Sequence, residues 1–483
     1  MKLFAPALLI LGAILNILAL FMLIPLILSI SEDSRNQIAF VTAAVITSLS
    51  GIGLLLFARK TNLEFLQPRQ VFLITACAWL GTSFFSAIPF LLMRHHLSLA
   101  DAIFEGVSGI TTTGSSVMSG LDKLPRDILL WRSILNWIGG VGIIGMAIAI
   151  LPFLRVGGMR LFKTESSEWS DKAMPRARSL MAMIIYCYLG LSVICCLMFK
   201  LGGMSWFNAI NHAMATVSTG GFSTSDSSFG QFSSLWLMWI AIFFMLAGAI
   251  PFVLFVRLVV HQKFMFLRDA QVRGLLAIVL LTTCFLSIPL IYHQTMSPWE
   301  AITHSCFNLV SVITTTGFAS TDYQQWGNLT WIIFLFCTFI GGCSGSTSGG
   351  IKVFRLQLFG GLIKEQLVTA IHPKAIISRR YNNRIVSAEI IASSVSFMIF
   401  MFLSLLIITI ILGMTGLDLI TSFSGAATAL MNVGPGLGDL IGPAGNFASL
   451  SDTAKYTLSF GMLLGRLEFV TLLVLFSPAF WRT

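Results

Sequence analysis

The sequence predicts an all-α polytopic membrane protein with ten transmembrane helices and four re-entrant pore half-helices in a pseudo-fourfold arrangement. Three observations support this fold class. Hydrophobic residues make up 56% of the 483 residues and charged residues only 10%, against roughly 25% charged in an ordinary globular domain. Stretches such as 3–31 and 390–417 contain no Asp, Glu, Lys or Arg, and a helix needs about 20 apolar residues to cross a bilayer. Four shorter apolar stretches each end in a glycine-containing loop.

Ten apolar segments have the length of a membrane span. The first two, 3–30 and 37–58, form a prefix. We interpret the first as a retained helix, because it is too long for a signal peptide and lacks a small-residue cleavage site. The other eight cover 71–93, 131–154, 179–200, 231–256, 272–292, 328–351, 386–414 and 454–480.

Between the members of each later pair of spans lies an apolar stretch that is too short to cross the membrane. These stretches cover 99–114, 205–220, 299–317 and 417–434. Irregular backbone at membrane depth is tolerated only where protein buries it or water lines it, so four such elements predict a central aqueous path. The expected organisation is a two-helix prefix, 1–66, followed by four pore repeats at 67–170, 171–268, 269–375 and 376–483.

The four loops at the ends of these stretches are unequal copies of one sequence. Loop 1 (104–114) and loop 3 (307–317) share eight of eleven residues without a gap. Loop 2 (215–222) keeps a hydroxyl-rich approach to glycine, whereas loop 4 (429–436) keeps only the glycine and its apolar approach. Internal duplication explains this pattern. Any site built from threonine hydroxyls should be incomplete in the fourth quadrant.

Positive charge gathers in four segments, which hold twenty of the thirty Lys and Arg: 59–70, 155–178, 257–273 and 352–384. By the positive-inside rule these segments face the cytoplasm, and both termini are then cytoplasmic. The net charge of +10 is therefore interpreted as topology, with no nucleic-acid partner. The intervening loops carry acidic residues that would concentrate cations at an outer entrance, namely Asp101, Glu105, Asp226, Glu300, Asp322 and Asp418.

The loop chemistry predicts a filter for a large monovalent cation, K⁺. Backbone carbonyls can replace the water that a dehydrated cation loses, and glycine permits the backbone conformation that aims them into a pore. Each half-helix would direct its partly negative C-terminal end at the path. The predicted filter consists of Thr111, Thr112, Thr113 and Gly114; Val217, Ser218, Thr219 and Gly220; Thr314, Thr315, Thr316 and Gly317; and Met431, Asn432, Val433 and Gly434.

A glycine-rich run at 341–350 interrupts the span at 328–351 with five Gly and three Ser. Each Gly costs about 1 kcal/mol relative to Ala in a helix. The run is either a close-packed helix crossing or, as we favour, a broken helix whose loop projects under the filter as a gate. The predicted gate consists of Gly342, Cys343, Ser344, Gly345, Ser346, Thr347, Ser348, Gly349 and Gly350, with Lys352 and Arg466.

Arg466 is a charge within the last span, which makes it a functional candidate. In one interpretation it pairs with Glu468 or reaches the cytoplasmic edge. In the other it faces the pore below the filter and raises the barrier to cations. Lys352 is interpreted as a second such charge or as an ordinary positive-inside residue.

The filter loops, the run 341–352 and the segment 463–468 resemble the Trk/Ktr/HKT superfamily of cation transporters, and the TrkH-type branch in particular. The two-helix prefix favours that branch over Ktr. The resemblance implies K⁺ uptake across a bacterial inner membrane by a homodimer. It also implies a cytosolic TrkA-type subunit that binds the nucleotide and docks on 155–178 and 352–384. Gly114, where sodium-selective relatives often carry Ser, supports K⁺ selectivity.

Three other functions are weighed against the pore. Gly-x-Ser-Gly matches at Ser108 and Ser344 suggest an intramembrane protease, but no histidine is well placed to activate either serine, so no enzyme activity is predicted. An alternating-access carrier for a small solute also fits broken helices, and a Na⁺-permeable transporter is a further alternative. His212 and His304 are interpreted as packing or capping residues. No cofactor is expected on this chain, and the only metal expected is K⁺ at the filter.

Overall fold

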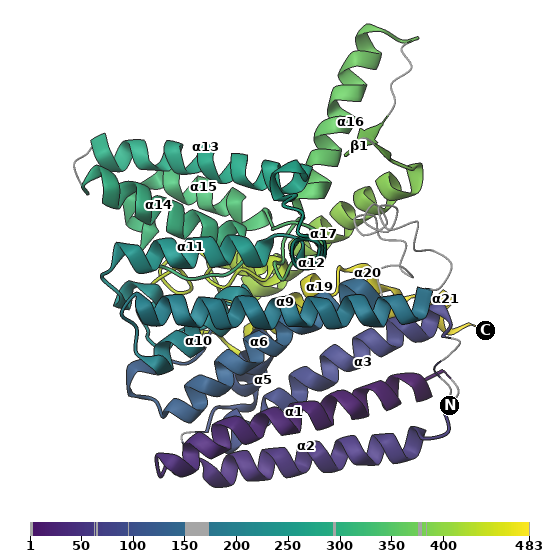
Figure 1. Cartoon of the computed structure of the whole chain (residues 1–483), viewed down its shortest axis with the longest axis vertical. Coiled ribbons are helices and arrows are strands. Elements are labelled where there is room, and N and C mark those ends of the chain that lie inside the picture. The colour runs from purple at the N-terminus through teal and green to yellow at the C-terminus, as the bar shows by residue number, and fades with distance from the viewer. Residues whose placement is uncertain are drawn as a thin grey trace.

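The computed structural model describes residues 3–482 apart from 62, 64–65, 95, 150–172, 293–295, 375–378 and 383 (Figure 1). Helices dominate the described part of the chain. Its two short strands, β1 (Arg380–Tyr381) and β2 (Arg384–Ile385), pair antiparallel as a small hairpin beside α16. The all-α polytopic class predicted from the sequence is therefore confirmed.

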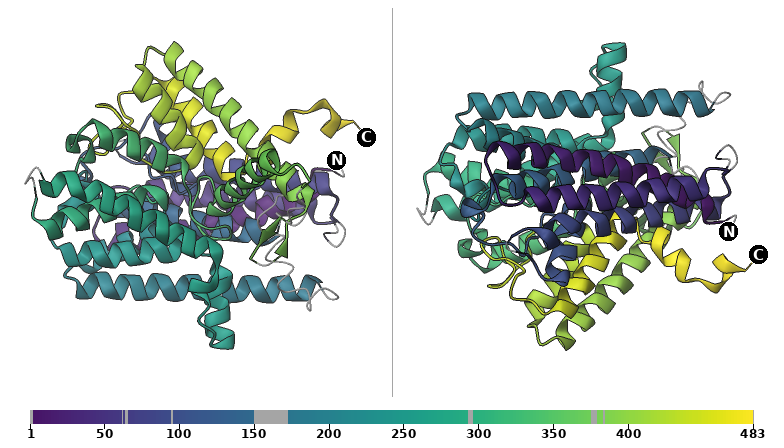
Figure 2. Two further views of the ribbon diagram at one scale, coloured as in Figure 1. Left: turned by 90° about the horizontal axis from the view of Figure 1, so that it is seen from above. Right: turned by 90° about the horizontal axis from the view of Figure 1, so that it is seen from below.

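The prefix is a pair of long helices, α1 (Ala5–Ser31) and α2 (Gln37–Ala58). A Cβ atom added at Gly12 would lie 2.8 Å from the carbonyl oxygen of Gly51. Small residues let two helix backbones approach this closely. Figure 2 shows the pair running side by side across one face of the molecule, with α9 along one edge of that view.

The remaining helices repeat one pattern: a long helix, a short buried helix and a second long segment. Repeat 1 contains α3 (Pro68–Ser86) with α4 (Ile88–Leu92), α5 (Leu99–Ile110) and α6 (Arg126–Ala149). Repeat 2 contains α9 (Ala173–Leu201), α10 (Trp206–Val217), α11 (Leu235–Ala249) and α12 (Phe252–His261). Repeat 3 contains α13 (Ala270–Tyr292), α14 (Pro298–Ile313), α15 (Asn328–Phe339) and α16 (Val353–Ile371). Repeat 4 contains α17 (Ala388–Met414), α18 (Leu419–Met431), α19 (Asp452–Arg466), α20 (Val470–Leu473) and α21 (Pro478–Trp481).

The second long segment is broken in three of the four repeats. In repeat 3 the helix stops at Phe339 before the glycine-rich run, so the predicted break is present. Two further breaks were not predicted. The span expected at 231–256 bends by 93° between α11 and α12, and the span expected at 454–480 bends by 107° after Arg466.

Each unpredicted break has a local backbone cause. Pro251 caps the start of α12, and Ile250 before it is extended, because proline disfavours helical backbone in the preceding residue. After α19, Glu468 and Phe469 both have positive φ, of 57° and 56°. Among the described residues, seven helices pass as membrane spans by length and composition, or nine if each bent pair counts as one. The expected span at 328–351 is reduced to the 12-residue α15.

Burial separates an outer shell from a central core. A third or less of the residues are buried in the membrane-length apolar stretches of α1, α2, α9, α13 and α17. In the corresponding stretches of α3 and α6 the buried share is 61% and 67%. The four short helices α5, α10, α14 and α18 lie in the core, with nearly every side chain buried towards their C-terminal ends. Both chain termini lie on the right-hand side of the view in Figure 1, and α16 projects upward from the upper right of the body.

Candidate ion filter and gate

The four short core helices, here called the pore helices, begin in the same way. A side-chain oxygen at each N-cap accepts a hydrogen bond from the backbone N–H three residues later. The capping residues are Ser98, Ser205, Ser297 and Asp418. This repeated cap is a sign of the fourfold repeat that the sequence comparison of the loops missed.

The pore helices also end in the same chain reversal. Thr112, Thr219, Thr315 and Asn432 each adopt left-handed backbone, with φ between 53° and 58°. The next N–H in each loop donates to the carbonyl five residues earlier, as from Thr113 to Ser108 at 2.9 Å and from Val433 to Thr428 at 3.1 Å. This is the Schellman closure of a helix.

Threonine is a costly residue for a left-handed position. Its branched Cβ makes positive φ an outlier, whereas Asn tolerates this region. Loop 4 therefore carries Asn432 at the position that suits it, although its sequence departs from Thr-Thr-Gly. Strained backbone persists where the surrounding structure determines it and gathers at functional sites.

The backbone corrects the predicted register of loop 2. Two residues after each left-handed residue comes a glycine with positive φ, namely Gly114, Gly221, Gly317 and Gly434. Gly221, rather than Gly220, is thus the counterpart of Gly114, and the second tetrad is 218–221 instead of 217–220. Gly220 stands at the position of Thr113, where an added Cβ would lie 2.5 Å from Asn136. Two adjacent glycines hid this shift in the sequence.

The four loops close into a ring. Each glycine lies so close to a carbonyl oxygen of the next loop that an added Cβ would clash with it, at 2.5 Å for Gly114 and 2.8 Å for Gly434. These contacts run from Gly114 to the oxygen of Gly220, from Gly221 to Thr316, from Gly317 to Val433 and from Gly434 to Thr113. Four carbonyls at equivalent positions therefore lie around one closed circuit.

The threonine hydroxyls of the filter brace their own loops. In loop 1, Thr111 Oγ1 donates to the carbonyl of Val107 at 2.7 Å and lies 2.7 Å from Thr113 Oγ1. Loop 3 repeats this arrangement at Thr314 and Thr316. Loop 4 has Met431 at the first of these positions, so the bracing hydroxyl is missing in that quadrant. There Asn432 Nδ2 instead donates to Thr113 Oγ1 at 3.0 Å and joins loop 4 to loop 1.

A glycine of the second long helix supports the pore helix in repeats 1, 2 and 4. Gly139, Gly248 and Gly465 lie against the last helical carbonyls of α5, α10 and α18, at Ile110, Val217 and Leu430 respectively. In repeat 3 the glycine-rich loop, residues 341–350, takes this place. The N–H of Gly349 donates to Thr315 Oγ1 at 2.7 Å. Thr347 Oγ1 donates to the carbonyls of Gly248 and Val217 at 2.9 and 3.2 Å.

The glycine-rich loop therefore docks against the C-terminal ends of three pore helices. Besides the contacts with α10 and α14, Gly349 lies against the carbonyl of Met431 at the end of α18. The loop is also fastened to the bend between α11 and α12, since Cys343 N donates to the carbonyl of Ala249 at 2.8 Å and Phe252 N donates to that of Gly345 at 3.0 Å. The predicted residues 342–350 thus lie together beneath the ring.

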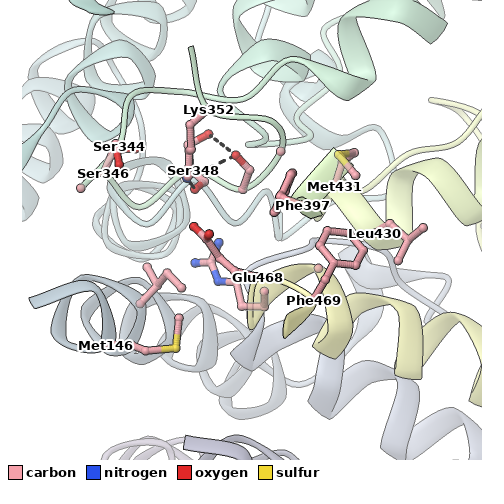
Figure 3. Close-up of a pocket in the computed structure, with 16 residues that line it drawn as sticks. Met146, Ser344, Ser346, Ser348, Lys352, Phe397, Leu430, Met431, Glu468 and Phe469 are labelled. Atoms are coloured by element: carbon pink, nitrogen blue, oxygen red, sulfur yellow. Dashed lines mark hydrogen bonds between the residues drawn. The ribbon is translucent and has the colours of Figure 1, made fainter. Parts of the chain in front are cut away.

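Two basic side chains, Lys352 and Arg466, and the acidic Glu468 line a cavity of about 30 Å³ below the ring. Lys352 Nζ donates to the carbonyl of Ser348 on the glycine-rich loop (Figure 3). Arg466 is only 2% exposed, and its Nε and Nη2 atoms have no hydrogen-bond partner within the described residues. Glu468 pairs with Arg355, so the considered pairing of Glu468 with Arg466 is absent. Sequence reasoning missed Arg355, whose position in a basic segment resembles an ordinary positive-inside residue.

Comparisons with known proteins agree with this architecture. The profile of the TrkH family, described as a cation transport protein, matches residues 37–483. The Trk system potassium uptake protein TrkI of Halomonas elongata is 45% identical over 99% of this chain and 97% of its own length. TrkH of Vibrio parahaemolyticus, also described as a Trk system potassium uptake protein, is 36% identical over 98% of both chains.

A solved structure shares the fold. The crystal structure of the potassium transporter TrkH from Vibrio parahaemolyticus superposes with a TM-score of 0.91 at 33% identity. The match covers 99% of this chain and 100% of that one. The chain therefore belongs to the TrkH family of cation transport proteins.

Proposed function

We propose that this chain is the pore-forming membrane subunit of a Trk-type system that takes up K⁺ across a bacterial inner membrane. The observation that carries the proposal is the closed ring of four equivalent chain reversals, one from each repeat. The printed names of its relatives, Trk system potassium uptake proteins, support the same ion.

The filter works through backbone oxygens. Carbonyls from the four tetrads, 111–114, 218–221, 314–317 and 431–434, replace the hydration shell of K⁺ as it enters the ring. The braced hydroxyls hold these peptides in position. The C-terminal ends of the four pore helices carry partial negative charge, which favours a cation directly below the ring.

The gate is the glycine-rich loop together with the charges beside it. In the closed state the loop rests on the pore-helix ends through Thr347 and Gly349, and Lys352 holds it from below. Arg466 adds a buried positive charge that disfavours a cation in the cavity. Opening requires the loop to leave Thr315 and Val217, and the flanking glycines permit that backbone movement.

A cytosolic nucleotide-binding subunit of the TrkA type moves this gate, and the membrane subunit acts as a homodimer. Helix α16 runs directly from Lys352 and projects from the body (Figure 1). Its exposed Ile363, Leu367 and Ile371 form an apolar stripe at helical spacing, which suits contact with protein. Arg379 donates to both oxygens of Glu365, at 2.7 and 2.9 Å, and so lowers the pKa of that carboxyl. The other predicted docking segment is 155–178, and its residues 155–172 lie outside the described residues.

The topology follows the basic segments. Both termini and the start of α16 lie on the right-hand side of the view in Figure 1, and we assign that side to the cytoplasm. We keep the repeat boundaries at 66, 170, 268 and 375 as part of the proposal; the gaps before α3 and before α13 support those at 66 and 268.

The rival functions have less support. An alternating-access carrier would suit the three broken segments, but the ring is held by contacts between all four repeats, which suits a fixed path. Ser108, one of the two protease-like serines, has a buried Oγ without a partner within the described residues. Gly114 argues against the Na⁺-permeable alternative, because sodium-selective relatives often carry Ser at this position. An added side chain there would press on loop 2.

Growth of a K⁺-uptake-deficient bacterial strain at low external K⁺ tests the proposal. We expect the chain, expressed with a TrkA-type partner, to restore growth and to give Rb⁺ tracer flux in proteoliposomes that excess K⁺ blocks. A chain that reaches the membrane in full amount and yet supports neither growth nor Rb⁺ flux would contradict the proposal.

A further inference from the structure

In each pore helix a side chain near one equivalent position hydrogen-bonds to the residues that follow the filter loop of the same repeat. The position lies six residues before the first filter residue and holds Glu105, His212, Asn308 and Gly425 in repeats 1 to 4. His212 Nε2 lies 3.0 Å from Ser223 Oγ, and Asn308 Oδ1 accepts from the N–H of Ser320 at 3.0 Å. In repeat 4 the neighbouring Ser424 makes the tie, accepting from Leu437 N at 2.9 Å.

The tie of repeat 1 is the ionic one. Glu105 accepts from the N–H of Val117 and from Ser116 Oγ at 3.0 Å each. Its carboxylate also pairs with Arg132 of α6, with Nε and Oε1 2.7 Å apart. The two side chains are 0% and 2% exposed. Burying two charges costs free energy that a well-packed apolar pair avoids, so the pair needs a reason beyond stability.

Arg132 also reaches a second filter loop. Its Nη1 donates to the carbonyl of Ser223 at 2.9 Å, and its Nη2 donates to Ser116 Oγ at 3.0 Å. Its guanidinium lies 4.1 Å from the centre of the Phe222 ring. Ser116 and Ser223 each follow a filter glycine by two residues, Gly114 in loop 1 and Gly221 in loop 2. A single planar side chain thus sets the separation of two adjacent loops.

The equivalent positions on the other second helices are apolar. Counted from the supporting glycines Gly139, Gly248 and Gly465, the residue seven places earlier is Arg132 in repeat 1, Ala241 in repeat 2 and Leu458 in repeat 4. Repeats 2 and 4 form their chain reversals without an ion pair at this position. The fold of a quadrant therefore does not require the pair, which leaves the fine spacing between loops 1 and 2 as its role.

We propose that Glu105 and Arg132 are positioning residues for ion selection, which fix the distance between loops 1 and 2 and hence the discrimination of K⁺ against Na⁺. The inference rests on the proposed function. A ring that loosens between two loops can contract around the smaller ion, whereas a braced ring stays at the size that suits K⁺.

The test is a double variant that removes both charges together, Glu105→Asn with Arg132→Leu, which copies the side chains of repeats 3 and 4. The change leaves neither member of the pair behind as an unpaired charge. We expect the protein to reach the membrane and the ratio of Rb⁺ to Na⁺ flux in proteoliposomes to fall by about tenfold, the effect of losing one or two hydrogen bonds between the loops. An unchanged ratio would overturn the proposal, whether or not total flux falls.

A conservative variant keeps the test decisive if the double variant does not fold. In Arg132→Lys the positive charge stays beside Glu105, but an ammonium lacks the fork that reaches Ser116 and Ser223 together. We expect thermal stability in detergent close to that of the parent and a flux ratio lowered about threefold, the effect of one weakened hydrogen bond. A variant with lowered stability and the full ratio would show a purely structural pair and refute positioning.

The control is a second ion pair, between Asp101 and the buried Lys455, with Nζ and Oδ1 2.6 Å apart and the Asp101 side chain 22% exposed. It joins the first turns of α5 and α19, and the side-chain partners that the described residues give to Asp101 are Lys455 and Ser98, away from Ser116 and Ser223. The double variant Asp101→Asn with Lys455→Leu should change stability while keeping the ratio of Rb⁺ to Na⁺ flux. If the ratio falls as much as in the Glu105 and Arg132 double variant, the loss of any ion pair relaxes selection, and a specific role for Arg132 is refuted. If the parent itself shows no preference for Rb⁺, the proposed function fails. If the parent is selective and the Glu105 and Arg132 variants match it, only this inference fails.

Discussion

Repeats 1 and 3 carry almost the same filter sequence on different supports. In repeat 1 the left-handed Thr112 sits above α6, which is unbroken as far as the chain is described, and its Oγ1 is buried without a partner among the described residues. In repeat 3 the equivalent Thr315 is bonded to Gly349 N and lies 3.2 Å from Ser348 Oγ on the glycine-rich loop. Under the proposed function, this contrast assigns ion selection to the filter sequence that the two repeats share and gating to the second segment of repeat 3.

Removing the glycine-rich loop, which supports the filter in repeat 3 but not in repeat 1, should have the largest effect on Rb⁺ flux. Gly341 and Gly350 lie in contact, so a chain with 343–349 deleted spans a short gap. If the docked loop closes about 99 of every 100 molecules, its removal raises Rb⁺ flux in the absence of the partner on the order of a hundredfold. Gly360→Ala is the control, because nothing lies within 4 Å of the added Cβ. Flux that stays low and still depends on the partner would rule out the loop as the gate.

A side chain at the filter glycines should affect repeats 1 and 3 alike. Gly114 and Gly317 both have φ of 84°, and an added Cβ at either would meet a carbonyl of the next loop. We expect Gly114→Ser and Gly317→Ser each to lower the ratio of Rb⁺ to Na⁺ flux about tenfold, since such strain costs about 1–3 kcal/mol. Selectivity that survives both changes would contradict the filter assignment.

Equivalent hydroxyls should behave differently in the two repeats. Thr315→Val keeps the side-chain shape but removes the bond to Gly349, so we expect resting Rb⁺ flux to rise about threefold to tenfold, the effect of one buried hydrogen bond. Thr112→Val, the matched change in loop 1, removes no such bond to the glycine-rich loop and should raise resting flux less. Equal responses would mean that repeat 3 has no special link to the gate.

The smallest effect is expected at Asn432, which closes the ring between loops 4 and 1. Asn432→Thr restores the residue type of the other quadrants, but Thr is costly in left-handed backbone and cannot reproduce the bonds from Nδ2 to Thr113 and Met462. We expect the free energy of unfolding to fall by about 2 kcal/mol, measured by thermal unfolding in detergent. A variant as stable as the parent would argue against Asn as an adaptation to this position.

The sequence predicted whatever depends on local composition. Apolar length predicted the polytopic helical class, and the glycine content of 341–350 predicted the break after α15. It missed the break at Pro251, although proline after an extended residue is a readable signal. The break at Glu468 and Phe469 has no such signal, because packing against the rest of the chain holds two ordinary residues at positive φ.

Details of the site that depend on contacts between repeats were beyond the sequence. The register of loop 2 became clear only when Gly221 proved to share the backbone of Gly114. The partner of Glu468 is 113 residues away, at Arg355. Likewise, Glu105 and Arg132 are separated by a whole loop, and nothing in their spacing announces a pair.

The closed circuit of loops has a consequence for biosynthesis. Three quadrants hold a threonine in a conformation that it avoids unless neighbours impose it, and the last neighbour to be synthesised is repeat 4. Until Asn432 binds Thr113, the three strained loops of the nascent chain lack the contacts with loop 4 that complete the ring. The contacts of Gly317 with Val433 and of Gly434 with Thr113 close the circuit, so the complete ring can form only after repeat 4 has been synthesised.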